Sequence, residues 1–310
     1  MIVTLTMNPA LDRTVSLPAP LAVGDVQPAD DISEDAAGKG VNVARVLAAA
    51  GDDVRAVLPL DPADPYAALL ARLDHIVVPI TGSARANLTI TDPHGVTTKL
   101  NLPGPHLGPD TAEELIDAVV AASEGASWLA LCGSLPPGVG DDFYVQVIDA
   151  VREQVEHPPL IAVDTSGSAL AQTVTSGSPD LIKPNEVELA ELASADVTSD
   201  ISEVAAVART LVPSRVGSAL ITLGGAGAIF VDSDVAMHAA IPPGVRVRST
   251  VGAGDSSLAG YLHAHIAGSA PHDALVSAVR HGSATASLPG TRLATPDDLP
   301  RGDVALTRIL

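Results

Sequence analysis

The segment with the clearest chemical potential is Gly252-Ala253-Gly254-Asp255, which an apolar, helix-like run follows. Glycines at a helix start let backbone amides approach a ligand closely, and the helix dipole favours negative charge there. The turn therefore predicts a site for phosphoryl oxygens. Asp255 is badly placed to hold an anion, but it could accept a proton from an alcohol that attacks phosphorus. This segment alone leaves open the alternative that Asp255 merely caps the helix.

The charge balance restricts the ligands that the chain could bind. With 37 acidic and 17 basic residues, the net charge is −20, which argues against nucleic acid and against an anionic membrane surface as partners. An acidic protein that binds small anions must gather its few cations around them. The only lysines are Lys39, Lys99 and Lys183, and two of them lie in motifs that could bind ligands.

The segment AAGKGVNVA (36–44) is the second candidate site. Gly38 and Gly40 would let the backbone approach a ligand, and Lys39 would supply a cation near a helix start. Asn42 could bond a hydroxyl group through both its donor and its acceptor. A glycine-rich helix start with a solvated lysine is the alternative.

Two further segments carry polar groups at positions where strands are expected to end. KPNEVEL (183–189) places Asn185 and Glu188 one helical turn apart on one face. TLGGAGA (222–228) places Thr222 and several glycines after an apolar strand. A helix N-terminus with its usual acidic residues would explain the first segment equally well.

The apolar pattern alternates short runs typical of strands with longer runs typical of helices. Strands are expected at 2–7, 128–133, 160–164, 180–183 and 218–225, and helices at 39–51, 111–123, 141–155 and 202–212. This βαβ rhythm predicts an α/β fold, with a mostly parallel sheet covered by helices on both faces. Ligands of such sheets bind at the carboxyl ends of the strands, which is where the motifs begin.

Residues 12–34 and 86–101 break this rhythm with the period-2 alternation of hairpin strands. We expect them to form a small β lid over the ligand edge of the sheet, within a single domain spanning 1–310. Surface hairpins without a role are the alternative. The proline-rich stretch 58–66 is too short for a domain linker.

The remaining composition predicts a cytoplasmic protein. No apolar run reaches the length of a membrane helix, and the first residues lack the basic region of a secretory signal. Cys132 is the only cysteine, which excludes a disulfide framework and a thiolate metal cluster.

Taken together, the motifs resemble those of the ribokinase-like carbohydrate kinases, and among them the phosphofructokinase B branch. The resemblance covers nearly the whole chain and rests on TLTMNPALD (4–12), AAGKGVNVARVLAAAG (36–51), CGSLPPGV (132–139), KPNEVEL (183–189), TLGGAGA (222–228) and STVGAGDSSLAGYL (249–262). It implies a ribokinase-like three-layer α/β/α fold with a β lid. It also implies an enzyme that uses ATP and Mg²⁺ to phosphorylate a sugar.

The resemblance also assigns roles to residues. Asp255 is implied as the catalytic base, and the amides of Gly252, Ala253 and Gly254 as the anion hole. The sugar side is implied at Asp12, Gly38, Lys39, Gly40, Asn42, Arg85, Asn87 and Ser134, with Lys39, Arg85 and Asn87 on the phosphate already carried by the substrate. The ATP side is implied at Lys183, Asn185, Thr222, Gly224, Gly225, Gly227 and Ser283. Asn185 and Glu188 are implied to organise Mg²⁺, largely through water, which suits this ion.

Two positions depart from the pattern of the resembled family. Asp61 stands where a glycine is usual, in a shortened, proline-rich loop, and Ser283 stands where asparagine is frequent. The first departure concerns the sugar side and the second the adenine side. Lid sheets of this family often pair, so a homodimer through the lid is also implied.

Lys39 and the segment STVGAGDS most resemble 1-phosphofructokinases, which implies transfer from ATP to fructose 1-phosphate to give fructose 1,6-bisphosphate. Tagatose-6-phosphate kinases share the lysine, whereas 6-phosphofructokinases of this branch more often have glycine there; both remain alternatives. A non-catalytic sensor of sugar phosphates is a further alternative, although it would not need Asp255. A dinucleotide-dependent dehydrogenase is excluded, because MNPALDR follows the first strand in place of GxGxxG.

Overall fold

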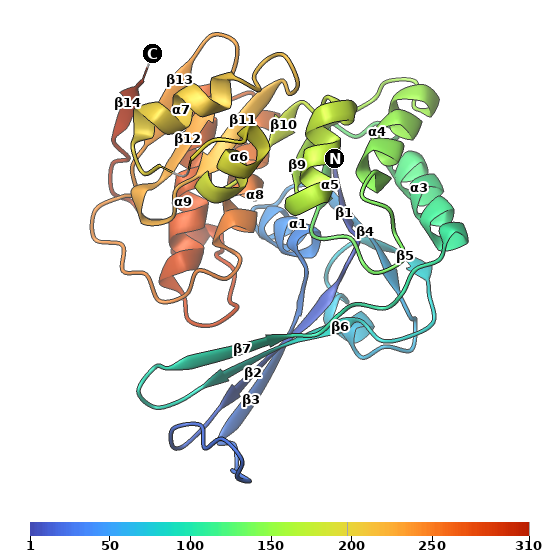
Figure 1. The fold of residues 1–310 in the computed structure, drawn as a ribbon, viewed down its shortest axis with the longest axis vertical. Helices are drawn as coiled ribbons and strands as arrows, with labels where there is room; N and C mark the ends of the chain where they lie inside the picture. Colours follow the sequence, from blue (N-terminus) through green and yellow to red (C-terminus); the bar gives the residue numbers. More distant parts are fainter. Residues whose placement is uncertain (197, 310) are drawn as a thin grey trace.

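The computed structural model describes residues 1–196 and 198–309, which form a large and a small β-sheet with helices around the large one (Figure 1). From edge to edge, the large sheet runs β14 (Leu306–Arg308), β13 (Ala236–Ala239), β12 (Ala228–Val231), β11 (Ser218–Thr222), β10 (Leu181–Ile182), β9 (Leu160–Asp164), β8 (Trp128–Cys132), β1 (Ile2–Thr6), β4 (Val54–Leu60) and β5 (His75–Pro79).

The strands from β11 to β5 are parallel, as the βαβ rhythm predicts. All five strands expected from the apolar pattern form, and each ends within a few residues of its predicted end. The antiparallel edge formed by β12, β13 and β14 was not expected. These strands are only three or four residues long, too short to show a clear period in the sequence.

Helices cover both faces of the large sheet and enclose two hydrophobic cores. One core lies under α3 (Pro109–Ser123), α4 (Phe143–Gln154), α5 (Gly167–Gln172), α6 (Glu186–Ala193) and α7 (Ile201–Arg209). The other lies under α1 (Lys39–Ala49), α2 (Tyr66–Leu69), α8 (Ala253–Ile266) and α9 (Pro271–Ser287). Alternate residues of one strand enter different cores: Ile2 points to the second, whereas Val3 and Leu5 point to the first. The three-layer α/β/α prediction is confirmed.

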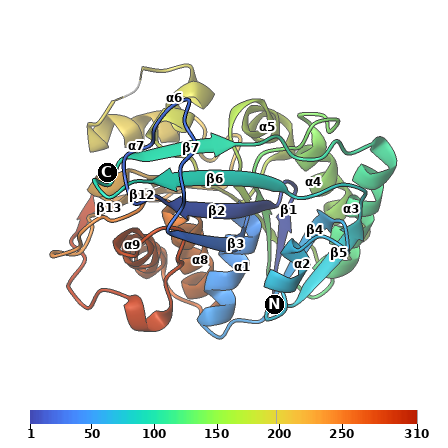
Figure 2. The same ribbon diagram turned by 90° about the horizontal axis from the view of Figure 1, so that it is seen from below.

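The small sheet is the lid, in the order β3 (Asp31–Ala37), β2 (Ala10–Ser16), β6 (Arg85–Thr91) and β7 (Thr97–Asn101). It projects from the carboxyl end of the large sheet and crosses beneath the body of the molecule (Figures 1 and 2). The two segments expected to form a lid, 12–34 and 86–101, do pair through β2 and β6. A turn at Asp92 closes the β6–β7 hairpin, where the Asp92 carboxylate accepts hydrogen bonds from the amides of His94 and Val96.

The register of the lid gives it two unlike faces, because residues opposite one another across neighbouring strands share a face. One face is polar and carries Asp12, Thr14, Ser33, Asp35, Arg85, Asn87, Thr89, Lys99 and Asn101. The other carries Leu11, Val15, Ile32, Leu88, Ile90 and Leu100, with Arg13 and Glu34 as an ion pair. The polar face is turned to the body, since Thr291 donates a hydrogen bond to Asp35 (2.5 Å).

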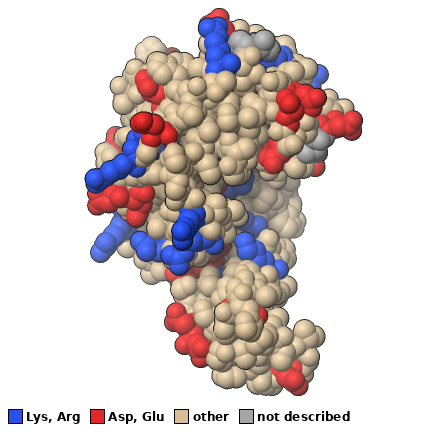
Figure 3. All heavy atoms as spheres, turned by 90° about the vertical axis from the view of Figure 1, so that its left-hand side faces the viewer, with Lys and Arg blue, Asp and Glu red and all other residues tan. Residues whose placement is uncertain are grey.

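The surface charges are unevenly distributed. On the side shown in Figure 3, basic side chains gather over the lower part of the body, next to the lid, and acidic ones lie mostly toward the edges and on the lid. Among the described residues, no helix combines the length and apolar character that crossing a bilayer requires.

Candidate active site

Asp255 lies in the first turn of α8, where its side chain is almost fully buried. Gly252 is the N-cap with φ of 73°, a left-handed conformation that favours glycine, and a Cβ there would lie 2.7 Å from Leu293. The helical ladder starts with the bond from Ser256 N to Gly252 O, so the amides of Gly254 and Asp255 precede it. Ala253 N contacts Thr250 O at 3.4 Å, a long hydrogen bond. Gly254 is only partly buried whereas Asp255 is buried, so the Gly254 amide is the candidate donor to an anion.

Asn42 holds the carboxylate of Asp255 from the neighbouring helix α1. Asn42 Nδ2 donates a hydrogen bond of 2.8 Å to Asp255 Oδ2, and both side chains are buried. Asn42 therefore orients the carboxylate that the sequence predicts to be the base. The capping alternative does not hold, because the N-cap of α8 is Gly252.

Asp164, at the end of β9, is a site residue that the sequence interpretation missed. Its carboxylate has no exposed surface and lies between two lysines. Lys39 Nζ donates to Asp164 Oδ1 at 2.6 Å, and Lys183 Nζ lies 3.3 Å from Asp164 Oδ2, at ion-pair distance but without hydrogen-bond alignment. A signal was available, since the expected strand 160–164 ends in an aspartate at the edge where ligands bind.

Burial and the neighbouring charges set the protonation of these groups. Burial raises the pKa of Asp255 to about 6, the negative charge of Asp164 adds to this, and Lys39 and Asn42 oppose it. Burial acts on Asp164 in the same direction, but Lys183 and Lys39 outweigh it and hold its pKa below the usual value. Burial would lower the pKa of Lys39, yet Asp164 and then Asp255 raise it. Lys39 is therefore charged, and Asp255 is poised to take up a proton near neutral pH.

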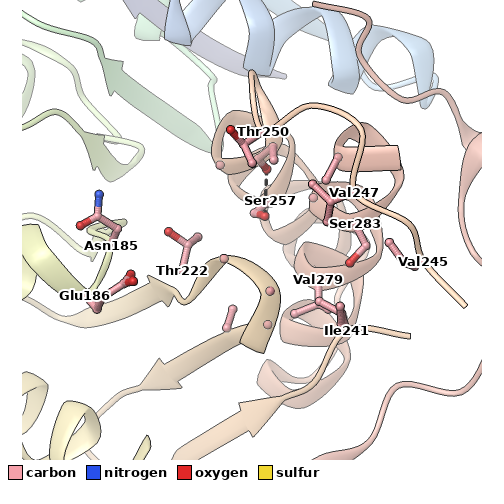
Figure 4. Close-up of a pocket in the computed structure, with 18 of the residues that line it drawn as sticks. Asn185, Glu186, Thr222, Ile241, Val245, Val247, Thr250, Ser257, Val279 and Ser283 are labelled. Carbon is pink, nitrogen blue, oxygen red and sulfur yellow. Dashed lines mark hydrogen bonds between the residues drawn. The ribbon is translucent and has the colours of Figure 1, made fainter. Parts of the chain in front are cut away.

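A cavity of about 490 Å³ opens beside this cluster, between β11 and the start of α8. In Figure 4, Asn185, Glu186 and Thr222 lie on one side and Thr250 and Ser257 on the other, with Ile241, Val245, Val247 and Val279 forming an apolar end. Of the residues predicted for ATP, the cavity is lined by Asn185, Thr222, Gly224, Gly225, Gly227 and Ser283.

Gly254 connects the cavity to the charged cluster. It lines the cavity, and a Cβ built on it would lie 3.1 Å from Lys183 Nζ. The ammonium group of Lys183, which follows β10, therefore lies next to the start of α8. The Lys183 side chain is almost fully buried. A phosphoryl group held at the Gly254 amide would be bordered by the cavity, by Lys183 and by Asp255.

The glycines of the 222–228 turn have different tasks. A Cβ at Gly227 would lie 2.0 Å from the carbonyl oxygen of Ala239, so glycine is required there by close packing on β13. Gly224 and Gly225 have open space around them, and they can lie against a ligand. Ser283, on α9, is mostly buried and lines the cavity.

Asn185 and Glu188 form a capping box at the start of α6. Asn185 Oδ1 accepts hydrogen bonds from the amides of Val187 and Glu188, and Glu188 Oε2 accepts one from Asn185 N. This is the alternative that the sequence left open, and it is compatible with a metal role. The box uses only Oε2 of the Glu188 carboxylate, and the other oxygen is a hard donor of the type that Mg²⁺ prefers.

The lid brings together Asp12, Arg85 and Asn87 on its polar face. Asp12 and Asn87 are partners across β2 and β6, and Asn87 Nδ2 donates to Asp12 Oδ1 at 2.8 Å. Arg85 Nε and Asn87 Oδ1 are buried without a hydrogen-bond partner among the described residues. Burial raises the pKa of Asp12, which Asn87 and Arg85 partly offset. Unused, preorganised polar atoms of this kind are typical of a binding site.

Lys39 was predicted to bind the substrate's phosphate together with Arg85 and Asn87. In the structure Lys39 contacts Asp164 and lies near Asp255, and its contact with the substrate's phosphate stays a prediction. Gly38 and Gly40 pack α1 against β1, since a Cβ on either would lie within 2.7 Å of the Thr6 side chain. A role of these glycines toward the sugar stays a prediction.

Ser134 is exposed after β8 and lies 3.4 Å from Nδ2 of Asn8. Oδ1 of Asn8 is buried without a hydrogen-bond partner within the described ranges. The sequence interpretation did not single out Asn8, although it stands in the first motif, MNPALD. Ser134 and Asn8 flank the end of the central strands, and a contact of Ser134 with the sugar stays a prediction.

In the shortened loop, acidic residues build local turns. Asp61 Oδ1 accepts from the amide of Ala63, and Asp64 accepts from the amides of Tyr66 and Ala84. The Tyr66 hydroxyl then donates to the carbonyl oxygen of Ala37 at the base of the lid (2.6 Å). The carboxylate of Asp61, which replaces the usual glycine, thus closes a local turn with Ala63.

Several known proteins are similar to this chain over most of its length. The 1-phosphofructokinase of Rhodobacter capsulatus is 38% identical over 275 residues, covering 85% of this chain and 83% of the relative. ATP-dependent 6-phosphofructokinase isozyme 2 of Escherichia coli strain K12 is 32% identical over 314 residues, covering 99% of both. The crystal structure of Escherichia coli phosphofructokinase-2 with potassium superposes with a TM-score of 0.88, at 30% identity and 96% coverage of each chain.

A tetrameric inhibited form of that enzyme is similar too, with a TM-score of 0.82 at 31% identity and 92% coverage of each chain. The model of the pfkB family of carbohydrate kinases matches residues 3–298. These findings confirm the resemblance that the sequence motifs indicated. The chain belongs to the pfkB family of carbohydrate kinases.

Proposed function

We propose that the protein transfers the γ-phosphoryl group of ATP to the C6 hydroxyl of fructose 1-phosphate, giving fructose 1,6-bisphosphate and ADP. The observation that carries this proposal is the position of Asp255. Its carboxylate is held by Asn42, has a pKa raised to about 6, and adjoins the helix start at Gly254 that also borders the cavity. A base, an anion site and a nucleotide-sized cavity thus meet at one helix N-terminus.

In this proposal, the nucleotide lies in the cavity with its base at the apolar end and its phosphates toward Gly254. The C6 oxygen of the sugar attacks the γ-phosphorus, the bond to the β–γ bridging oxygen breaks, and Asp255 takes the hydroxyl proton. The Gly254 amide and Lys183 balance the charge of the transferring group. Proton removal is a modest part of the rate, and most of it comes from positioning and charge stabilisation.

Mg²⁺ is part of the proposal as the partner of ATP. Glu188 would hold it through a carboxylate oxygen and water, and Asn185 would fix the orientation of Glu188 through the capping box. When bound, the ion would neutralise charge on the nucleotide phosphates. The ion would thus sit at the rim of the nucleotide cavity.

The phosphate already carried by the substrate would bind to the polar face of the lid. Arg85 offers a guanidinium with an unused buried Nε, and Asp12 with Asn87 offers groups that suit sugar hydroxyls. Arginine is suited to phosphate because its donors form a rigid fork.

Fructose 1-phosphate is favoured over fructose 6-phosphate by two observations. The identity to a 1-phosphofructokinase, 38%, exceeds the 32% to the 6-phosphofructokinase isozyme 2. Lys39 is the residue shared with 1-phosphofructokinases and tagatose-6-phosphate kinases. The deciding experiment compares initial rates of ADP formation with fructose 1-phosphate, fructose 6-phosphate and tagatose 6-phosphate. The highest kcat/KM is expected for the first; a higher value for either isomer would contradict this choice, and no turnover at all would favour the sensor.

We also propose that two copies pair through their lids. The support is the apolar lid face, on which Ile32 and Leu100 are 57% and 51% exposed. A contiguous apolar sheet face of this kind is typical of an interaction surface. A tetrameric form of the related Escherichia coli enzyme shows that the fold is compatible with assembly.

A further inference from the structure

The buried carboxylate of Asp164 has no part in the reaction proposed above, yet it lies at the centre of the site's charges. It is wholly buried at the end of β9, and an unpaired carboxylate in such a place would be costly. Two ammonium groups compensate it, one on each oxygen. Both lysines come from motifs that the sequence predicts to bind ligands, and the Asp164 carboxylate contacts both of them.

The two lysines come from different elements and contact different oxygens of the Asp164 carboxylate. Lys39 opens α1, next to the base of the lid, whereas Lys183 follows β10 and reaches the helix start at Gly254, which borders the cavity. Lysine is a flexible cation, so its ammonium needs a fixed partner to occupy one place. Asp164 supplies that partner to both lysines at once.

Building on the kinase function proposed above, we propose that Asp164 is a positioning residue that holds Lys39 and Lys183 on either side of the path of the transferring phosphoryl group. Asp164 itself touches neither substrate, because its carboxylate is enclosed. Its effect on the rate passes through the two ammonium groups, whose placement stabilises the charge of the transferring group.

Asp164 also influences the base electrostatically. The charged or titratable groups around Asp255 are Lys39 from α1, Cys132 from β8, Asp164 from β9 and Lys183 from the segment after β10. Removing the negative charge of Asp164 would favour the ionised form of Asp255, and removing the positive charge of Lys39 would disfavour it. The two changes should therefore move the pH dependence in opposite directions.

The test compares Asp164→Asn, which keeps the volume of the side chain, with the wild type under saturating MgATP and sugar phosphate. We expect kcat to fall about 100-fold, as for a misplaced catalytic group. The acid limb of the kcat/KM profile should move about one unit to lower pH. The matched control is Asp180→Asn, at the other end of β10, where the carboxylate accepts the Ile161 amide. This control should leave the acid limb in place, even if it lowers the melting temperature.

Lys39→Met keeps the proposal testable if Asp164→Asn fails to fold. The Lys39 side chain is 36% exposed and Lys183 still compensates the Asp164 carboxylate, so its replacement should preserve the fold. It should lower kcat strongly and move the acid limb to higher pH. The double variant Lys39→Met/Asp164→Asn should lose no more than about threefold beyond the worse single variant, because the two residues act as one unit.

A kcat within about twofold of the wild type in either single variant would overturn the positioning role, and so would an acid limb that neither change moves. A loss of kcat in the double variant equal to the product of the two single-variant losses would overturn the positioning role as well. If the wild type prefers another sugar phosphate, only that choice of substrate fails, and the variants are compared on the preferred sugar. If the wild type phosphorylates none of the three sugars, the proposed function fails and this inference with it.

Discussion

At the scale of single residues, the protonation of Asp255 should control the pH dependence of the reaction. Burial and Asp164 raise the pKa of this carboxylate to about 6, and the base acts only when it is ionised. We therefore expect kcat/KM to fall tenfold per unit as the pH drops below about 6 and to be level above it. Initial rates between pH 5 and 8 in buffers of constant ionic strength would check this. A flat profile down to pH 5 would contradict a base with a raised pKa.

Gly254 offers a second prediction at this scale. A methyl group there would lie 3.1 Å from Lys183 Nζ and would displace the ammonium, which is the free end of a flexible side chain. Gly254→Ala should therefore keep or slightly raise stability, by up to about 1 kcal/mol, since alanine favours the helix. It should lower kcat at least about tenfold through the shifted lysine. Thermal unfolding and steady-state rates measure both; unchanged kcat would show that Lys183 does not act at this helix start.

At the scale of elements, the packing of α1 on β1 sets the position of both Lys39 and Asn42. A Cβ at Gly40 would lie 2.8 Å from the backbone oxygen of Leu5, which cannot move aside. We expect Gly40→Ala to lower the free energy of unfolding by roughly 1–3 kcal/mol, because overpacking outweighs the gain of up to about 1 kcal/mol in helix propensity. Urea denaturation would measure this change in the free energy of unfolding.

The control for that change is Gly108→Ala, at the N-cap of α3, where the Cβ position is open and φ is −80°. Gly108→Ala should lower the free energy of unfolding by less than about 1 kcal/mol. Equal losses in the two variants would mean that α1 can move away from β1 without penalty, and then the close packing would not position the site.

Most of the elements could be predicted because each carries its own local signal. The strand at 128–133 and the helix at 39–51 are recognisable from apolar periodicity, and the phosphate-binding turn from its glycines. The end of the expected strand 160–164 marked Asp164 as a possible site residue, but its partners could not be assigned in this way. Lys39 lies 125 positions earlier, and no local pattern indicates which cations lie near the end of that strand. Charge pairs between elements that are distant in the sequence depend on strand order, which periodicity does not give.

The tertiary contacts of the motif residues were likewise beyond the sequence. Asn42 was expected to bond a sugar hydroxyl, which stays a prediction, and its amide also donates to Asp255. Gly227 was expected beside a nucleotide; it lines the cavity, and its missing side chain also makes room for Ala239. In both cases the motif was recognised, and the tertiary neighbour that fixes the residue type was not visible.

At the scale of the whole molecule, the apolar lid face should determine the state of assembly. Ile32→Asp places a charge on the exposed apolar face proposed for the contact, so this variant should be a monomer at concentrations where the wild type is a dimer or larger. Light scattering coupled to size-exclusion chromatography gives the mass. The control is Ser33→Asp, which lies one residue away on the opposite, polar face. A wild type that is monomeric, or a variant with the mass of the wild type, would contradict pairing through the lid.

The whole molecule serves to bring one carboxylate to the helix start where nucleotide and sugar phosphate are proposed to meet. The most direct measurement is therefore kcat for Asp255→Asn, with binding of fructose 1-phosphate and of ADP followed by calorimetry. Asp273→Asn, in the exposed first turn of α9, is the matched control. We predict that Asp255→Asn lowers kcat by about 10²–10⁴-fold while both ligands still bind, and that Asp273→Asn behaves as the wild type. A kcat for Asp255→Asn near that of the wild type would contradict the account.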